Sequence, residues 1–172
     1  HAEVSESDIV KMENPAVAKL ASHIGDRQVR NRGTIGGSLA NNDPSACYPA
    51  AILALGGIIH TTKRDIKAED FFIDLFETAL DEDEIITAIS IPKPYAAAYE
   101  KFPNPASRYA MVGVFVAKFN SEIRVAVTGA GEEGVFRYSA IETALLDEFS
   151  SEALSDITIS ADGLMSDIHA EA

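Results

Sequence analysis

The chain has 172 residues, of which 47% are hydrophobic and 24% are charged, and its formal net charge at pH 7 is −13. These proportions are typical of a globular protein and exclude a disordered one. The acidic charge argues against nucleic acid as a partner, because phosphates attract a positively charged protein surface.

No apolar run approaches the roughly 20 residues that a membrane-spanning helix needs. The opening residues HAEVSESDIV have neither the basic start nor the apolar stretch of a signal peptide. Cys47 is the only cysteine, which excludes an internal disulfide and a thiolate metal cluster. We therefore expect a cytoplasmic protein with no membrane span.

The first half of the chain is predicted to mix helices and strands. Asn14 and Pro15 fit the N-cap and first position of a helix, and Gly25 fits its end. Pro92 and Pro94 mark a domain boundary. Between Gly25 and this boundary we expect, in chain order, a buried helix over 48–55, a strand over 58–62, a helical turn over 68–72 and a strand over 85–92.

The second half is predicted to be mostly antiparallel β-structure. The segment AYEKF starts it, two strand candidates over 109–119 and 123–131 form a β-hairpin, and an amphipathic helix covers 139–149. Further helical pieces are expected over 150–157 and 163–172. The fold class is therefore α+β, with one domain over residues 1–94 and a second over 95–172.

The acidic residues gather at the carboxy-terminal end. Residues 121–172 hold eleven carboxylates against two arginines, a net charge of −9. We interpret this as a solvated helix surface, and a docking face for a basic partner is the alternative.

The sequence offers no catalytic constellation of side chains. The four histidines His1, His23, His60 and His169 are scattered without HxxxH or HExxH spacing, so we expect no metal site. We interpret His60, inside an apolar strand, as a strand residue with a satisfied hydrogen bond. Ser38 lies in no GxSxG elbow.

The glycine-rich stretch RNRGTIGGSLANNDPSACYPA is the candidate for binding. Gly33, Gly36 and Gly37 let the backbone approach a bulky ligand and point N–H groups at its oxygens. Polar side chains that could bind such a ligand surround them: Thr34, Ser38, Asn41, Asn42 and Asp43, with the cations Arg27, Arg30 and Arg32. A tight turn between buried elements is the structural alternative.

The segment from Arg30 to Gly56 resembles the flavin-binding medium subunit of the xanthine dehydrogenase and aerobic carbon monoxide dehydrogenase family of molybdenum hydroxylases. In that family a segment of the form RNxGTIGGxLxxxDPxx(D/E)xP wraps FAD. The segments ALGGIIHTTK, FF, EIITAISIP, YEKF and RYAMVGVFVA follow in the family's order. The resemblance implies the second subdomain of a PCMH-type FAD-binding fold, a mostly antiparallel sheet with helices, followed by a small α+β carboxy-terminal domain.

The resemblance also implies which residues contact FAD. The segment from Thr34 to Ser38 would meet the diphosphate and ribityl chain, with Asn31 holding the loop and Asp43 shaping the turn. An apolar residue near the isoalloxazine edge and an aromatic against the flavin ring complete the site. The full implied set is Asn31, Thr34, Ile35, Gly36, Gly37, Ser38, Asp43, Cys47, Ile86 and Tyr109.

By this resemblance the chain is an oxidoreductase subunit that carries electrons from [2Fe–2S] clusters through FAD to NAD or another acceptor. The [2Fe–2S] clusters and the molybdopterin would lie on a small and a large partner subunit, because the cysteines that clusters need are absent here. A homodimer also stays open. The isolated chain is expected to be inactive.

The sequence departs from the family pattern at three points, one of which is a carboxy-terminal helical end, DIHAEA, that is shorter than the family's. Cys47 occupies a position that is usually acidic, and no AGGxSL-type loop of the first FAD subdomain precedes residue 14. We therefore expect a chain that holds part of the FAD site. Two alternatives remain: a non-catalytic interaction module that has lost flavin, and a different PCMH-type flavoenzyme such as the UDP-N-acetylenolpyruvylglucosamine reductase type.

Overall fold

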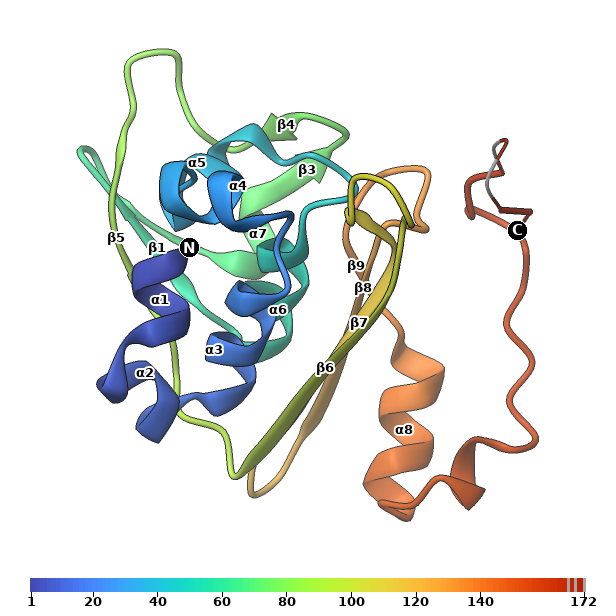
Figure 1. Ribbon diagram of the computed structural model, residues 1–172. Coiled ribbons are helices and arrows are strands. Elements are labelled where there is room, and N and C mark those ends of the chain that lie inside the picture. Colours follow the sequence, from blue (N-terminus) through green and yellow to red (C-terminus); the bar gives the residue numbers. More distant parts are fainter. Residues whose placement is uncertain (167, 169, 172) are drawn as a thin grey trace.

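The computed structural model describes residues 1–166, 168, 170 and 171, and it has the α+β fold that the sequence predicts (Figure 1). The helices are α1 (Ala2–Glu6), α2 (Asp8–Glu13), α3 (Pro15–Ser22), α4 (Arg27–Arg32), α5 (Ile35–Asn41), α6 (Cys47–Leu55), α7 (Ala68–Phe71), α8 (Ser139–Asp147) and the 3-10 helix η1 (Glu152–Leu154). The strands are β1 (Ile58–Thr61), β2 (Asp65–Lys67), β3 (Phe72–Asp74), β4 (Glu77–Thr78), β5 (Ile86–Ser90), β6 (Ala96–Pro103), β7 (Ala110–Lys118), β8 (Ile123–Thr128) and β9 (Phe136–Arg137).

The described β-structure consists of two sheets and a short hairpin. Strands β2, β1 and β5 form an antiparallel sheet in that order, and β3 pairs with β4. Strands β6 to β9 form a four-stranded antiparallel sheet in chain order. The predicted hairpin is confirmed, since β7 and β8 pair from Gly113 opposite Thr128 to Lys118 opposite Ile123.

Helix α6 lies near the centre of the molecule, and all its residues are buried (Figure 1). A helix that is apolar on every side has no face suited to water, so it needs neighbours all round. Helices α3 and α5 pack against it, as do strands β7 and β8. The predicted buried helix is therefore confirmed.

The four-stranded sheet is covered on both faces. Phe115 and Ala126 belong to the cluster of buried side chains around α6. Val125 belongs instead to a second cluster with Leu145 of α8. Neighbouring residues of a strand point to opposite faces, so α6 covers one face of this sheet and α8 the other (Figure 1).

The main core continues past the predicted domain boundary at Pro92 and Pro94. Its buried side chains extend from Ala16 in α3, through α6, to Ala126 in β8. The two predicted domains therefore pack through a shared core, and their division stays a prediction.

The sequence predicts a loop for the glycine-rich segment, but the structure forms the helices α4 and α5 there. Each helix has a side-chain cap at its start. Asp26 accepts a hydrogen bond from the backbone N of Val29 at 2.9 Å, and Thr34 accepts one from the backbone N of Gly37 at 3.0 Å. Leu39 is fully buried, and this tertiary packing stabilises a helix whose glycines alone would not.

Helix α3 is shorter than predicted. It ends at Ser22 rather than at Gly25, and the Asn14 side chain makes no capping hydrogen bond. That side chain instead donates to the carbonyl oxygen of Pro92 at 3.3 Å, and so holds the start of α3 against the chain after β5. The other predicted elements of this half, including the helical turn α7, are confirmed within a few residues.

The carboxy-terminal part contains less helix than predicted. Helix α8 confirms the amphipathic helix, but the piece over 150–157 contains only η1. Residues 163–166 are not helical, and the rest of the predicted piece over 163–172 includes positions outside the described residues. Within the described part of the chain, no helix is both long enough and apolar enough to cross a bilayer.

Glu84 is a buried carboxylate in the loop before β5. Its oxygens accept hydrogen bonds from the Arg64 guanidinium, the Thr61 hydroxyl and the backbone N of Asp81. Because these donors favour the charged form, they lower the pKa of Glu84 to about 2. The carboxylate thereby joins the turn after β1 to the loop before β5.

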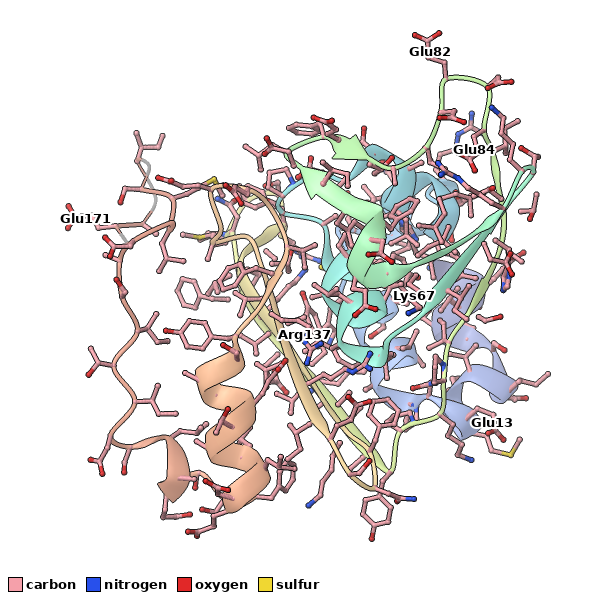
Figure 2. All side chains as sticks on the ribbon, turned by 180° about the vertical axis from the view of Figure 1, so that it is seen from behind. Glu13, Lys67, Glu82, Glu84, Arg137 and Glu171 are labelled. Atoms are coloured by element: carbon pink, nitrogen blue, oxygen red, sulfur yellow. The ribbon has the colours of Figure 1, made fainter. Side chains whose placement is uncertain are left out.

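We expect the stabilisation from Glu84 to depend on pH. Its pKa is lower in the folded chain than its ordinary value of 4.5, so the contribution is complete above about pH 4.5 and is lost as the pH falls toward 2. Glu84→Gln should therefore lower the melting temperature at pH 7, and the difference from wild type should shrink at pH 3. Glu82→Gln, at the exposed tip of the same loop (Figure 2), is the matched control and should change little. Equal effects of the two variants would contradict the assignment.

Candidate functional site

A cleft of about 460 Å³ lies between the start of α6 and the loop that joins β6 to β7. Four residues that the sequence analysis assigned to a ligand site line it, together with two cations: Ser38, Asp43, Cys47, Tyr109, Lys101 and Arg108. They come from α5, the following turn, α6, β6 and the loop before β7. The tertiary structure thus brings together residues from both halves of the chain.

Next to the cleft, α5 packs against β5, and this surface is called the α5 wall. The Thr34 hydroxyl caps α5, and a Cβ atom on Gly37 would lie 2.9 Å from that hydroxyl oxygen. The chain's own packing therefore explains why position 37 is a glycine. Packing does not require a glycine at position 36, because a Cβ atom there would meet only Ile86, at an ordinary contact distance of 3.7 Å.

The turn after α5 is anchored from the carboxy-terminal sheet. Asp43 accepts a hydrogen bond from the backbone N of Ser45 at 2.8 Å through Oδ1. The buried Thr128 hydroxyl donates to the carbonyl oxygens of Pro44, at 2.9 Å, and Ala46, at 2.7 Å. The second carboxylate oxygen of Asp43 makes no hydrogen bond within the described residues, so it remains an acceptor at the edge of the cleft.

Lys101 holds the far side of the cleft together. Its ammonium donates to the carbonyl oxygens of His23, at 2.7 Å, and Arg108, at 2.8 Å, and lies 3.6 Å from the Cys47 sulfur. These groups belong to the end of α3, the loop before β7 and the start of α6. One cation therefore connects three separate segments around the cleft.

Tyr109 follows a strained position in the backbone. Arg108 has a φ of 64°, in the left-handed region that side chains with a Cβ rarely adopt. The Lys101 contact and a hydrogen bond from the backbone N of Arg108 to the carbonyl oxygen of Asn104 hold it there. Asn104 is buried, and its amide nitrogen lies 3.2 Å from the Tyr109 hydroxyl. The loop thus presents Tyr109 to the cleft in a defined position.

The pKa shifts of a histidine and a tyrosine beside the cleft favour the neutral form of each side chain. Burial, followed by the positive charges of Lys19 and Lys101, lowers the pKa of His23. Burial, followed by the nearby Cys47, raises the pKa of Tyr99. The charged side chains that line the cleft are therefore the two cations Lys101 and Arg108 and the carboxylate of Asp43.

Several predicted site residues lie outside the cleft. Asn31 is exposed on α4, and its side chain makes no hydrogen bond within the described residues. Ile35 packs partly buried against the core. Ile86 also lies away from the cleft, beside Gly36 on the α5 wall. Thr34, Gly36 and Gly37 also lie outside the lining of the cleft, and all ten predicted ligand contacts stay predictions.

Two polar residues of the glycine-rich segment serve the fold. Asn42 is buried with a φ of 41°, and its amide donates to the carbonyl oxygens of Asp74 and Glu77, which fixes the β3–β4 hairpin. Arg30 donates to the carbonyl oxygens of Ile24 and Gly25. The Asn42 amide and the Nη1 atom of Arg30 thus serve the fold, whereas Arg27 and Arg32 are exposed.

The sequence analysis missed Lys101 and Arg108. The only available signal was their place in YEKF and SRYA, on either side of the PNPAS loop. Among the described residues, no group of three or more histidine, cysteine or acidic side chains could hold a metal ion. His169 lies outside the described residues.

Comparison with known proteins gives a family. Residues 1–94 match the model of the FAD-binding domain in molybdopterin dehydrogenase. The chain is 34% identical to the nicotine 6-hydroxylase medium subunit of Paenarthrobacter nicotinovorans, over all of this chain and 65% of that protein. It is 36% identical to the glyceraldehyde dehydrogenase medium chain of Sulfolobus acidocaldarius, over 67% of this chain and 43% of that one.

A solved structure agrees. A carbon monoxide dehydrogenase from Hydrogenophaga pseudoflava matches with a TM-score of 0.79 and 34% identity, over 88% of this chain and 57% of that one. The chain thus spans between 43% and 65% of the length of these three relatives. With a family model that covers more than half of its residues, the chain belongs to the family of FAD-binding domains of molybdopterin dehydrogenases.

Proposed function

We propose that this chain binds FAD along the cleft and the adjoining α5 wall, as part of the flavoprotein subunit of a molybdenum hydroxylase. The observation that carries the proposal is Gly36. Its backbone is not left-handed, and a side chain there would fit without strain. A glycine that neither conformation nor packing requires is best explained by a molecule that approaches the backbone closely.

The residues around the cleft fit the parts of FAD. The free oxygen of Asp43 and the Ser38 hydroxyl suit the sugar-alcohol hydroxyls of the cofactor. Lys101 and Arg108 supply positive charge for an anionic ligand in an acidic chain. Tyr109 offers a half-buried aromatic surface to a flat ring system.

FAD supplies redox chemistry when it is bound, because flavins accept electrons singly or in pairs. The chain's own residues would bind the cofactor, orient it and exclude water from one side. In this proposal the molybdenum cofactor and the [2Fe–2S] clusters lie on partner subunits, and electrons leave to NAD or another acceptor. The relatives' names, which include medium subunits and medium chains, support such an assembly. Those names mention nicotine and glyceraldehyde, so no single substrate class follows for this chain.

A second candidate function is an interaction module that has lost flavin. Cys47 favours it, because this sulfur occupies a position that is usually acidic in the resembling family. The sulfur is also buried against Lys101 instead of reaching outward. Under this reading the cleft remains, but the hydrogen bond to the cofactor that an acid would make is missing.

The primary test is a titration of the purified chain with FAD, followed by visible absorbance and by quenching of flavin fluorescence. We expect saturable binding with a dissociation constant in the micromolar range or below. The control is Tyr109→Ala, which removes the aromatic surface and should weaken binding without unfolding the chain. Absence of saturation for the wild-type chain would contradict the proposal and favour the module.

Gly36 and Gly37 form a matched pair. Gly36→Ala should keep the melting temperature or raise it slightly, since alanine favours a helix over glycine by about 1 kcal/mol. It should nevertheless weaken FAD binding by about tenfold or more, which corresponds to about 1.4 kcal/mol. Gly37→Ala should lower the melting temperature, because its Cβ would collide with the capping oxygen of Thr34. Unchanged FAD affinity in Gly36→Ala would show that no ligand approaches that backbone.

Cys47→Asp separates the two candidate functions. A carboxylate beside the Lys101 ammonium would be paired, and in a flavin-binding chain it should increase FAD affinity by restoring an acceptor. Cys47→Asn, of similar size but uncharged, is the control and should give a smaller gain. If neither variant binds FAD, the interaction module is the better description.

A further inference from the structure

Three side chains on the exposed face of the β2–β1–β5 sheet form a continuous hydrogen-bonded chain. The Nδ1 atom of His60 lies 2.7 Å from the Oδ1 atom of Asp65, and its Nε2 atom lies 2.7 Å from the Oγ atom of Ser90. Each residue comes from a different strand, with His60 on the central one. None of them lines the cleft proposed for FAD.

The chemistry of the partners determines where the protons lie. An ionised carboxylate can only accept a hydrogen bond, so Nδ1 of His60 carries the hydrogen and donates to Asp65. Nε2 is then an acceptor, and the Ser90 hydroxyl donates to it. A serine hydroxyl that donates to an imidazole can lose its proton to that base. When a carboxylate orients the imidazole, the three groups have the arrangement that activates serine nucleophiles.

The sheet holds this arrangement in place. His60 pairs with Asp65 across β1 and β2, and Ile58, two residues away on the same face, pairs with Ser90 across β1 and β5. On the opposite face Ile59 and Ile66 are buried, which fixes the register of the strands. The imidazole is itself well packed, with 28% of its side chain exposed.

The sequence contains no signal for this cluster. His60, Asp65 and Ser90 appear in an order and spacing that match no catalytic motif, and the sequence predicts His60 only as a strand residue with a satisfied hydrogen bond. Its hydrogen bonds are indeed satisfied, but by a carboxylate on one side and a hydroxyl on the other. Only the pairing of the three strands reveals the combination.

The geometry points to Ser90 as a nucleophilic acyl-acceptor site, independent of flavin, that reacts with small activated esters. In the step, the Ser90 Oγ forms a bond to the carbonyl carbon and the bond from that carbon to the leaving oxygen breaks. The leaving group departs with the electron pair, and the Ser90 proton passes to Nε2 of His60. The imidazolium is stabilised by Asp65 and returns the proton to the leaving group or to water.

The position on the sheet limits the donor. The three side chains lie on an open surface, and Ser90 lines neither the FAD cleft nor the four other pockets formed by Leu53 to Arg137, Ser45 to Glu171, Ala96 to Leu154 and Ser22 to Arg108. A large acyl chain would therefore have no enclosed binding surface. Small, reactive acyl donors fit this setting, and we expect formation of a stable acyl-serine rather than rapid turnover.

The test is to treat the chain with p-nitrophenyl acetate, follow nitrophenolate release, and locate the acetyl group by peptide mass spectrometry. We expect Ser90 to be acetylated well before Ser22 and Ser155. These are internal controls, because their hydroxyls donate to backbone carbonyls at 2.6 and 2.8 Å and have no base. His60→Gln should slow acetylation of Ser90 by about 100-fold, the usual contribution of a general base.

Two further variants test the roles of Ser90 and Asp65. Ser90→Ala should abolish the adduct in that peptide, and Asp65→Asn should slow it less than His60→Gln does, because the imidazole remains. Melting curves of each variant check that the sheet persists. Acetylation of Ser90 at the same rate as Ser22 and Ser155, or at an unchanged rate in folded His60→Gln or Asp65→Asn, would overturn the proposal.

Discussion

The complete burial of α6 is the constraint on which the other elements depend. Each large apolar residue of this helix contributes about 1.5–3 kcal/mol when it is buried. Because the helix has no polar face, α3 and α5 must cover one part of it and the four-stranded sheet another. The cleft lies where α6 begins, so its position follows from the packing of this helix. Packing around α6 therefore forms a core that joins the first and last thirds of the chain.

Anchoring across that core gives the candidate site its shape. Thr128, at the end of β8, holds the turn between α5 and α6 through two carbonyl oxygens. Lys101, in β6, joins the end of α3 to the loop that carries Tyr109. Both residues lie in the second half of the chain, whereas the glycines lie in the first. The site is therefore a property of the packed halves and not of the glycine-rich segment alone.

Charge has different effects in different parts of the molecule. The surface is strongly acidic, yet the cleft presents two cations, and the buried carboxylate of Glu84 is held charged by its donors. On the β2–β1–β5 sheet, a carboxylate, an imidazole and a hydroxyl meet although the sequence separates them by up to 30 residues. In each case the local partners, rather than the net charge, determine how the group behaves.

Elements with a strong local pattern were predictable from the sequence. The two strand candidates with a short turn between them predicted the hairpin of β7 and β8, and the apolar run between Pro49 and Gly56 predicted the buried helix α6. The segment from Arg30 to Gly56 was sufficient to indicate the family. The tertiary structure decided the rest. It stabilised α5 as a helix through the burial of Leu39, used Asn42 to hold the β3–β4 hairpin, and brought Lys101, Arg108 and the Ser90 cluster into place. These outcomes depend on contacts between residues far apart in the chain, which no local pattern can encode.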